Sequence, residues 1–372
     1  MDRIKVIHVI TDKNIGGAGS WLLNFLGYHD REKFQVRVIL PEDSLLKPRV
    51  GDLGVEIIDI GPMEESSYDR KAVARFAEVF RKEAPDVVHT HASLSARLGA
   101  KKAGVPAVVN TKHCMETRDG FAKRFIKKRI ANQCGSAVVA VSEAVGESLK
   151  AEGADRKDIK VIYSGVEPFR ELPGEERTAF RESFGISPED FLVGIAARLE
   201  PVKDHETFLR AASIVAKKIP DVKFIIMGTG SLEGALKARA EELGLSASVI
   251  FAGFIRDMER AMNALDLNVM TSREEALCLS VIEGMTVGVP ALGSDTCGLP
   301  EAIEDGVTGE LFPPGDAEGL AEKIIKLYGD RELLARYSEN ARRTAAEKFS
   351  PRKMCREIEA LYIELLHGKE KI

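Results

Sequence analysis

Two carboxylates eight positions apart, Glu275 and Glu283, lie in the segment 272–290, SREEALCLSVIEGMTVGVP, where a loop runs into a helix. We predict that Ser280 and Glu283 form a capping box, because Ser followed three residues later by Glu is typical of a helix start. The free N–H groups at such a start, around Leu279 and Ser280, bind anions, and carboxylates accept hydrogens from hydroxyl groups. This combination indicates a site for a sugar attached to a phosphate.

A basic pair follows the predicted strand 192–197. Arg198 comes directly after the strand, and Lys203 stands just before a helix that Asp204 could cap. A guanidinium and an ammonium group placed in this way would neutralise two phosphates and favour the departure of a nucleoside diphosphate. The alternative is a solvated pair of cations on a surface loop.

Each glutamate also has a structural explanation. Glu283 could serve the capping box alone, without any ligand. Glu275 could belong to a charged loop, although its position after the predicted strand 267–270 favours a ligand, since ligands of parallel sheets lie beyond the carboxyl ends of the strands.

Glycines follow the first predicted strand in the run NIGGAGS, residues 14–20. Gly16 and Gly17 would let the backbone approach a ligand closely, because no Cβ intervenes. The run is not a Walker A loop, which ends in Gly-Lys-Ser or Gly-Lys-Thr.

A second glycine pattern supports a rival function. Gly228, Gly230 and Gly234 resemble the dinucleotide fingerprint, which would make the protein a nicotinamide-dependent oxidoreductase. The next predicted strand, 249–252, has no acidic residue at its end to bind a ribose, and the pattern does not follow the first strand of its domain.

Three histidines, His89, His91 and His113, lie at or just beyond predicted strand ends. The spacing His-Thr-His offers at most one facing pair, so we expect no metal site. His89 could be a satisfied buried histidine. His113 is the candidate for the site, where it could donate to a sugar hydroxyl or a phosphate.

The segment 121–130, FAKRFIKKRI, alternates bulky apolar residues with five cations. Helices with an apolar face flanked by cations rest on anionic lipid headgroups, so contact with an anionic membrane surface through Phe121 to Ile130 is a hypothesis. An amphipathic helix packed on the sheet, with a charged outer face, is the alternative.

The elements that position these residues alternate between strand and helix in both halves, which predicts an α/β fold of two Rossmann-like doubly wound parallel sheets facing a cleft. The predicted strands are 6–10, 35–40, 55–60, 87–89, 107–110, 137–141, 159–162, 192–197, 223–227, 249–252, 267–270 and 291–293. The predicted helices are 18–26, 70–82, 94–103, 121–134, 143–152, 205–218, 232–243, 256–264 and 280–287, with helix from about 317 to the end.

Prolines and glycines interrupt this alternation between residues 165 and 190. We therefore expect a Rossmann-like domain at 1–166, a linker and domain edge at 167–190, and a second Rossmann-like domain at 191–348. The final segment, 349–372, is expected to be a helix that returns toward the N-terminal domain.

Composition sets further limits. With 372 residues, 44% hydrophobic and 30% charged, the chain suits two globular domains. The five cysteines form no CxxC pair, so we expect reduced thiols. The N-terminus resembles a strand and not a signal peptide, so we expect cytoplasmic residence. Peripheral contact with the inner face of the cell membrane is a hypothesis. Residues 1–165 hold 27 Lys and Arg against 22 Asp and Glu, a net +5, and the remainder is −10. The first half is thus the one suited to an anionic partner.

Several motifs together extend along nearly the whole chain. They are Glu-x7-Glu at Glu275 and Glu283, the pair Arg198 and Lys203, the Gly16-Gly17 loop, DVVHTH ending at His91, the segment around His113, VSEA at Val141, and CGLPEAIEDGVTGELFPPGD from Cys297. With these motifs the chain resembles the retaining glycosyltransferases of family 4, which have the GT-B fold and use nucleotide-sugar donors.

The resemblance implies roles for the matching residues. Glu283 would contact the donor ribose, Glu275 and His113 would lie by the transferred sugar, and Arg198 and Lys203 would bind the diphosphate. Gly16, Gly17, Leu279 and Ser280 complete the implied donor-binding set. The leaving phosphate would help to deprotonate the incoming hydroxyl, and neither a metal nor another cofactor is implied.

Three departures from the family pattern concern the sugar pocket. The family often has Gly-Phe-Gly after the first Glu, where this chain has residues 276–278, Ala-Leu-Cys; it usually has Gly where Asp204 stands, and Asn-Gly where Ser164 and Gly165 stand. These changes leave the identity of the donor sugar open.

The expected activity is transfer of a hexosyl unit from a nucleotide sugar, with UDP as the expected nucleotide, to a glycan or lipid-linked acceptor with retention, in cell-surface polysaccharide or glycolipid biosynthesis. No nucleic acid is expected as a partner. The alternatives are the oxidoreductase, an inactive glycosyltransferase-like binding protein, and a relative that epimerises nucleotide sugars.

Overall fold

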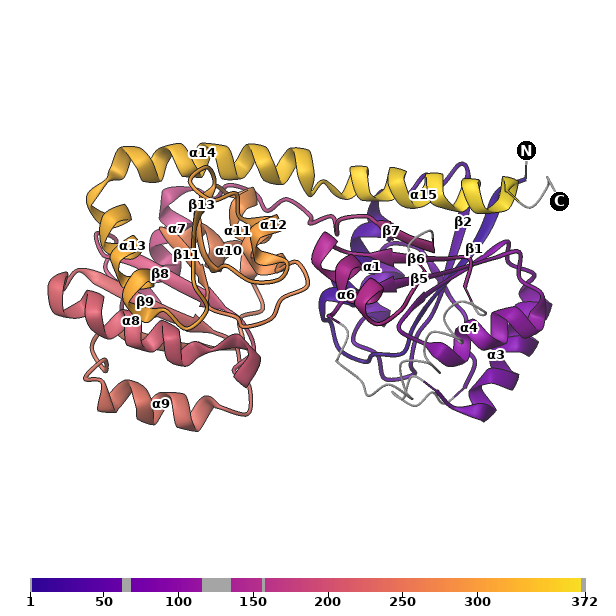
Figure 1. Cartoon of the computed structure of the whole chain (residues 1–372), viewed down its shortest axis with the longest axis horizontal. Helices are drawn as coiled ribbons and strands as arrows, with labels where there is room; N and C mark the ends of the chain where they lie inside the picture. Colours follow the sequence, from indigo (N-terminus) through magenta and orange to yellow (C-terminus); the bar gives the residue numbers. More distant parts are fainter. Residues whose placement is uncertain (1, 62–67, 116–134, 156–157, 369–372) are drawn as a thin grey trace. The chain divides into compact units, whose positions relative to one another are not determined.

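The computed structural model describes residues 2–61, 68–115, 135–155 and 158–368 (Figure 1). The chain divides into two compact units. The first unit consists of Met1–Val166 together with Ser350–Ile372, and the second unit is Glu167–Phe349.

The first unit is built on a seven-stranded parallel sheet of order β3-β2-β1-β4-β5-β6-β7. Its strands are β1 (Ile4–Ile10), β2 (Phe34–Ile39), β3 (Glu56–Ile57), β4 (Val87–His91), β5 (Ala107–Lys112), β6 (Ala137–Ala140) and β7 (Ile159–Val161). Its described helices are α1 (Gly17–Tyr28), α2 (Lys47–Asp52), α3 (Arg70–Glu83), α4 (Leu94–Ala103), α6 (Glu143–Ala151) and α15 (Pro351–His367).

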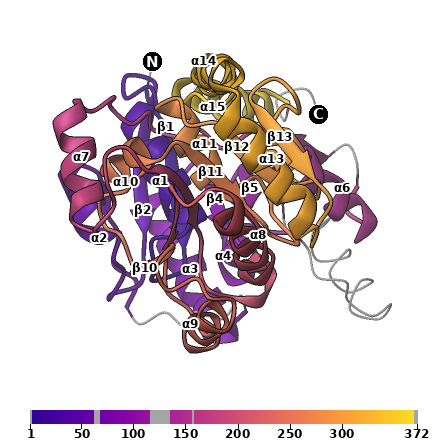
Figure 2. The same ribbon diagram turned by 90° about the vertical axis from the view of Figure 1, so that its left-hand side faces the viewer.

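The second unit is built on a six-stranded parallel sheet of order β10-β9-β8-β11-β12-β13. Its strands are β8 (Phe191–Ala196), β9 (Val222–Met227), β10 (Val249–Gly253), β11 (Leu267–Met270), β12 (Ala291–Ser294) and β13 (Gly309–Phe312). Its helices are α7 (Gly174–Glu182), the 3-10 turn η2 (Pro201–Lys203), α8 (His205–Lys218), α9 (Glu233–Glu242), α10 (Met258–Ala264), α11 (Leu279–Thr286), α12 (Leu299–Ala302), α13 (Ala317–Gly329) and α14 (Arg331–Lys348). Figure 2 views the molecule from the side of this unit, with α8 and α13, which contact each other, at the front.

Helices cover both faces of each sheet because the strands are apolar on both sides. In β8, Val193 and Ile195 belong to the core cluster formed with α8 and α13, whereas Leu192 belongs to the cluster formed with α7 and α10. In β1, Ile7 and Val9 face α3 and α4 in the same alternating way. This period of two is the pattern of strands buried on both faces.

The last helix, α15, completes the core of the first unit. Ile358 and Tyr362 are fully buried among residues of β1 and α1. At its start α15 crosses Gly165, where a Cβ would lie 2.4 Å from Pro351 Cα. Asn24 Nδ2 donates to the Gly165 carbonyl over 2.7 Å, so the backbone there is held closely by its neighbours.

Several elements were not predicted. The strand β13 and the helices α2, α7 and α12 are short, and α7 forms within the interrupted stretch 165–190, where it packs against α10. The membrane hypothesis on Phe121 to Ile130 falls outside the described residues. Among the described helices, none is long and apolar enough to cross a membrane. The four described cysteines, Cys114, Cys278, Cys297 and Cys355, form no disulfide.

Candidate active site

Lys203 and Glu275 meet in the second unit. Lys203 ends the turn η2 after β8, and Glu275 lies in the loop after β11; Nζ of the lysine donates to Oε1 of the glutamate in an ion pair. Ser272 Oγ donates to the same carboxylate oxygen over 3.0 Å. The side chains are 16% and 12% exposed, so the pair is shielded enough to be strong and open enough to meet a ligand. The ammonium group retains N–H bonds for a further anion.

The backbone around Lys203 is fixed by its neighbours. Its carbonyl accepts a hydrogen bond of 2.9 Å from Thr271 Oγ1. Asp204, the next residue, is buried with a left-handed φ of 48° and pairs with Arg273 over 2.9 Å. Asp204 is the N-cap residue directly before α8, but its side chain makes no cap hydrogen bond to the backbone, so the predicted side-chain cap is wrong. The carboxylate is used by Arg273 and by Thr207 Oγ1 instead.

The start of α11 also differs from the prediction. The helix begins at Leu279 after Cys278, whose φ of 63° is left-handed, and no side chain caps it. Ser280 is therefore inside the first turn, and the predicted capping box is wrong. The physical reason is that the left-handed turn at Cys278 starts the helix two residues earlier than a cap at Ser280 would. Among the described residues, no acceptor meets the N–H groups of Leu279 and Ser280.

Glu283 lies one turn along α11. None of the described residues donates a hydrogen bond to its carboxylate, and burial raises its pKa from 4.5 to about 7. With the capping box absent, the structural explanation for this carboxylate is gone. A shielded acid without a partner is typical of a ligand site.

Arg198 lies exposed in the loop after β8, near the Glu200 carboxylate, whose pKa is lowered by hydrogen bonds from Ser231 and, to a smaller extent, by Arg198. The loop with Gly228 and Gly230 packs against this segment. A Cβ on Gly228 would lie 2.1 Å from the Ala197 carbonyl oxygen, and one on Gly230 would lie 2.4 Å from the Leu199 carbonyl oxygen. Close packing of two loops explains these glycines without a dinucleotide.

His205 is a feature that the sequence did not reveal. It is 1% exposed, and neither ring nitrogen has a hydrogen-bond partner among the described residues. Burial and the nearby Lys203 charge lower its pKa to about 4, so the ring is neutral at pH 7. A buried polar group without a described partner is unusual and calls for an explanation, and this one lies beside Lys203.

The predicted residues of the first unit lie apart from this constellation in sequence and belong to another unit. Gly16 precedes α1, and neither a cap bond nor any atom within 4 Å of its absent Cβ restricts it. His113 follows β5, and its Nε2 lies 2.8 Å from His91 Nδ1. His89 is fully buried and bonded through both nitrogens, which confirms the prediction of a satisfied buried histidine.

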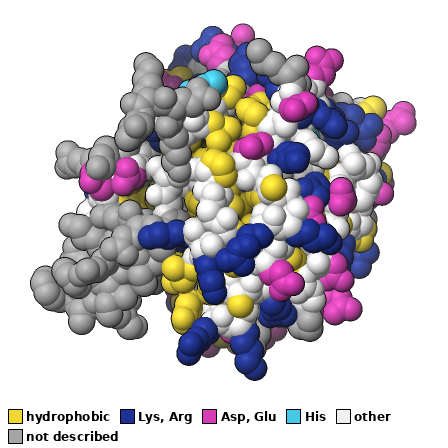
Figure 3. Space-filling model, turned by 90° about the vertical axis from the view of Figure 1, so that its right-hand side faces the viewer, with side chains coloured by type: hydrophobic (Ala, Val, Ile, Leu, Met, Phe, Trp, Pro, Cys, Tyr) yellow, Lys and Arg dark blue, Asp and Glu magenta, His cyan; other side chains and the backbone are white. Residues whose placement is uncertain are grey.

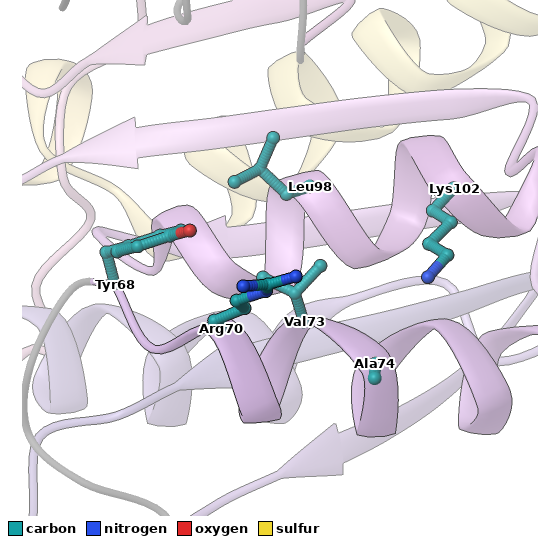
Figure 4. A pocket seen from close by; sticks show the side chains of 6 residues that line it. All are labelled: Tyr68, Arg70, Val73, Ala74, Leu98 and Lys102. Carbon is teal, nitrogen blue, oxygen red and sulfur yellow. The ribbon is translucent and has the colours of Figure 1, made fainter.

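Six cations on α3 and α4 are exposed, and Figure 3 shows a face of the molecule on which Lys and Arg side chains gather. The six exposed cations are Arg70, Lys71, Arg81, Lys82, Lys101 and Lys102. A groove of about 410 Å³ runs between the two helices (Figure 4). Its lining residues are Tyr68, Arg70, Val73, Ala74, Leu98 and Lys102. None of the predicted site residues lines this groove.

No cluster of three or more His, Cys, Asp or Glu residues in the described part of the chain is placed to hold a metal ion.

Family models match most of the chain. The model of "Glycosyl transferases group 1" matches residues 176–344, and that of "Glycosyltransferase Family 4" matches residues 15–170. The chain belongs to the group 1 glycosyltransferases. The predicted glycosyltransferase activity is thereby confirmed in its general form, and the oxidoreductase alternative is set aside.

Individual relatives agree with this glycosyltransferase assignment. A putative glycosyltransferase, EpsD, of Bacillus subtilis (strain 168) is 32% identical over 58% of this chain and 56% of its own length. A UDP-Gal:alpha-D-GlcNAc-diphosphoundecaprenol alpha-1,3-galactosyltransferase of Escherichia coli is 25% identical over 99% of this chain and 98% of its own. The structure of Anabaena Alr3699/HepE in complex with UDP and glucose superposes with a TM-score of 0.85 at 23% identity, covering 97% of this chain and 100% of the other. The predicted fold class, two Rossmann-like sheets as in GT-B glycosyltransferases, is confirmed.

Two of the departures from the family pattern now have a structural explanation. Cys278 and Asp204 stand where the family often has glycine, and both have left-handed φ, 63° and 48°. This glycosyltransferase keeps the glycine conformation with residues that rarely adopt it, and such strain is typical of functional sites.

Proposed function

We propose that this glycosyltransferase transfers a hexosyl unit from a UDP-linked sugar to a glycan or lipid-linked acceptor, with retention of the anomeric configuration. The observation that carries the proposal is the ion pair of Lys203 and Glu275 in the same unit as the uncapped start of α11. Binding of a sugar diphosphate requires a cation and free N–H groups for the phosphates and an acceptor for the sugar hydroxyls. Lys203, the start of α11 and Glu275 are the corresponding groups in this proposal.

Each part has a task in this proposal. Lys203 and Arg198 neutralise the diphosphate as it departs, which lowers the barrier by stabilising charge that develops in the transition state. Glu275 holds the lysine in place and accepts hydrogens from the sugar, and Glu283 accepts them from the ribose. Binding of UDP is supported by the relatives that are described with UDP or UDP-sugars.

The acceptor is assigned to the first unit. Its exposed cations on α3 and α4 suit an anionic acceptor such as a glycan on a lipid diphosphate, and the Escherichia coli relative is described as acting on a diphosphoundecaprenol-linked sugar. Peripheral contact with an anionic membrane would then bring the enzyme to its acceptor. Cell-surface polysaccharide or glycolipid synthesis is the corresponding pathway class.

The test is a screen of UDP-sugars against a lipid-diphosphate-linked glycan, with the anomeric configuration of the new bond read by NMR. Lys203→Ala should lower kcat by a factor on the order of 100 or more, as for the loss of a transition-state charge partner. Lys217→Ala removes an exposed lysine at the end of α8 and serves as the matched control. Full activity of Lys203→Ala, or an inverted product, would refute the proposal.

A further inference from the structure

Six side chains in the first unit form one continuous chain of hydrogen bonds that ends at His113. His113 Nε2 lies 2.8 Å from His91 Nδ1, and His91 Nε2 lies 3.2 Å from His8 Nδ1. Tyr362 of α15 continues the chain, with its hydroxyl oxygen 3.3 Å from His8 Nε2 and 2.6 Å from His89 Nδ1. His89 Nε2 then lies 2.6 Å from Thr111 Oγ1.

The strands and helices explain how the chain forms. His8 and His89 are paired neighbours on β1 and β4, and His91 is the partner of Thr111 on β5. Tyr362 reaches the same space from α15, and Trp21 packs edge-on against His113 with ring centroids 6.0 Å apart. The rings are thus held in fixed orientations.

All four imidazoles are neutral at pH 7. Burial is the main reason that their pKa values are lowered, to about 3 for His8 and His113 and well below 6.5 for His89 and His91. A neutral imidazole has one N–H donor and one acceptor nitrogen. When Tyr362 donates one of its two hydrogen bonds and accepts the other, the chain has two proton arrangements, one the reverse of the other, and His113 has a different tautomer in each.

The chemistry of the hydroxyl groups selects one arrangement. A phenol is a better donor than an alcohol, and burial raises the pKa of Tyr362 well above 10, so the phenol keeps its proton. Of its two contacts the one to His89 Nδ1 is the shorter, 2.6 Å against 3.3 Å to His8 Nε2, so Tyr362 donates to His89, and His89 donates to Thr111. In the other direction His8 donates to the tyrosine oxygen, His91 donates to His8, and His113 donates from Nε2 to His91.

We infer that this chain fixes His113 as the Nε2–H tautomer, with Nδ1 as a hydrogen-bond acceptor that recognises a sugar hydroxyl and rejects a phosphate oxygen. No described residue hydrogen-bonds Nδ1, and His113 is only partly buried. A nitrogen lone pair accepts a hydroxyl hydrogen but repels an anionic oxygen. His91, His8, His89, Tyr362 and Thr111 are then positioning residues. The sugar contact rests on the proposed function, whereas the tautomer does not.

Deleting either hydroxyl group of the chain should reverse the tautomers of the rings between it and His113, His113 included. In Tyr362→Phe the Nε2–H of His8 would face an apolar ring, and in Thr111→Val the Nε2–H of His89 would lose its acceptor. A buried donor without a partner is costly, so each proton should shift to the opposite nitrogen of its ring. His113 would then have its proton on Nδ1. The bridging protons cross their hydrogen bonds, His113 takes up a proton on Nδ1 from the solvent, and the ring that lost its acceptor gives up its Nε2 proton, so no net charge forms.

The experiment is ¹⁵N NMR of the full-length protein with labelled histidine. The His113 signals are assigned by their absence from the spectrum of His113→Asn. The Nδ1 signal of His113 should be pyridine-like in the wild type and pyrrole-like in Tyr362→Phe and Thr111→Val. Tyr337→Phe deletes another buried, hydrogen-bonded tyrosine hydroxyl, in the second unit, and should leave His113 unchanged. Native Trp21 fluorescence verifies that the first unit is folded. A protonated Nδ1 in the wild type, or unchanged His113 signals in both folded variants, would overturn the inference.

A transfer assay separates this inference from the proposed function. Tyr362→Phe and Thr111→Val should lower kcat/KM for the UDP-sugar about tenfold, the value of one hydrogen bond to the sugar. If His113 changes its tautomer in the two variants while kcat/KM for the UDP-sugar is unchanged, the contact between His113 and the sugar is refuted and the hydrogen-bond chain is not. Absence of transfer by the wild type with every UDP-sugar would refute the proposed function while the NMR result remains.

Discussion

Replacement of Glu283 by Gln should stabilise the second unit at pH 8 and abolish part of its pH dependence. The carboxyl is shielded, has no hydrogen-bond donor among the described residues, and has its pKa raised by burial from 4.5 to about 7. Below pH 4.5 both the folded and the unfolded chain hold this proton, so the group contributes nothing to the pH dependence of stability. Between pH 4.5 and about 7 only the folded chain keeps it, and the free energy of unfolding therefore falls as the pH rises.

Above pH 7 this loss is complete. A rise of the pKa from 4.5 to about 7 corresponds to at most about 3 kcal/mol of unfolding free energy. Gln has the same shape without the charge, so Glu283→Gln should regain most of this amount at pH 8 and little at pH 5. The gain would come with weaker UDP binding, the usual exchange of stability for function at an active site.

The assay is urea unfolding at pH 5 and pH 8. Circular dichroism follows both units, and fluorescence of Trp21, the single tryptophan, follows the first unit alone. Glu310→Gln is the matched control in the same unit, because that buried carboxylate is paired with Lys323 and Lys326 and has a lowered pKa despite its burial. It should destabilise the unit at pH 8. If Glu283→Gln behaved like Glu310→Gln, or left the pH slope unchanged, the reasoning would be refuted.

Three further predictions concern other parts of the molecule. UDP should bind more tightly as the pH rises from about 5 to 7, with release of a proton from Glu283, because bound ribose hydroxyls favour the ionised carboxylate. Calorimetry in buffers of different ionisation enthalpy measures the number of protons released. No proton should be released when UDP binds to Glu283→Gln. Gly165→Ala should destabilise the first unit by about 2 kcal/mol, since its Cβ would lie 2.4 Å from the backbone of α15. Gly27→Ala, in α1 of the same unit with open space around it, should not, and urea unfolding followed by Trp21 fluorescence tests both variants. Iodoacetamide should label the exposed Cys114 far faster than Cys278, whose pKa is raised by burial to about 12. Equal labelling rates of the two cysteines, measured by mass spectrometry, would contradict the burial of Cys278.

The sequence predicted most of both sheets because their strands are continuous apolar runs, which need no tertiary information to recognise. The strand β13, Gly-Glu-Leu-Phe, was missed since Glu310 looks out of place in a strand; its charge is accommodated by two lysines of α13. The capping box failed for a different reason. A left-handed residue such as Cys278 leaves no trace in composition or periodicity, so the start of α11 could not be located to the residue.

The hydrogen-bond chain at His113 was also beyond sequence reasoning. The histidines were visible, but Tyr362 is 273 positions from its partner His89, and nothing in the helix containing it indicates that contact. Long-range contacts of this kind depend on which face α15 presents to the sheet. The pairing of Lys203 with Glu275, 72 positions apart, could be approached from sequence because both follow strands of one sheet.

The return of α15 has a consequence for the order in which the protein can fold. The second unit is one unbroken stretch, Glu167–Phe349, inserted between two parts of the first unit. During synthesis from the N-terminus, the second unit therefore has all of its residues before the first unit does. The seven-stranded sheet of the first unit is synthesised earlier, but the space that Ile358 and Tyr362 occupy in its core stays unfilled until α15 has been synthesised. A nascent chain stopped after α14 should contain a finished second unit attached to an unfinished first one.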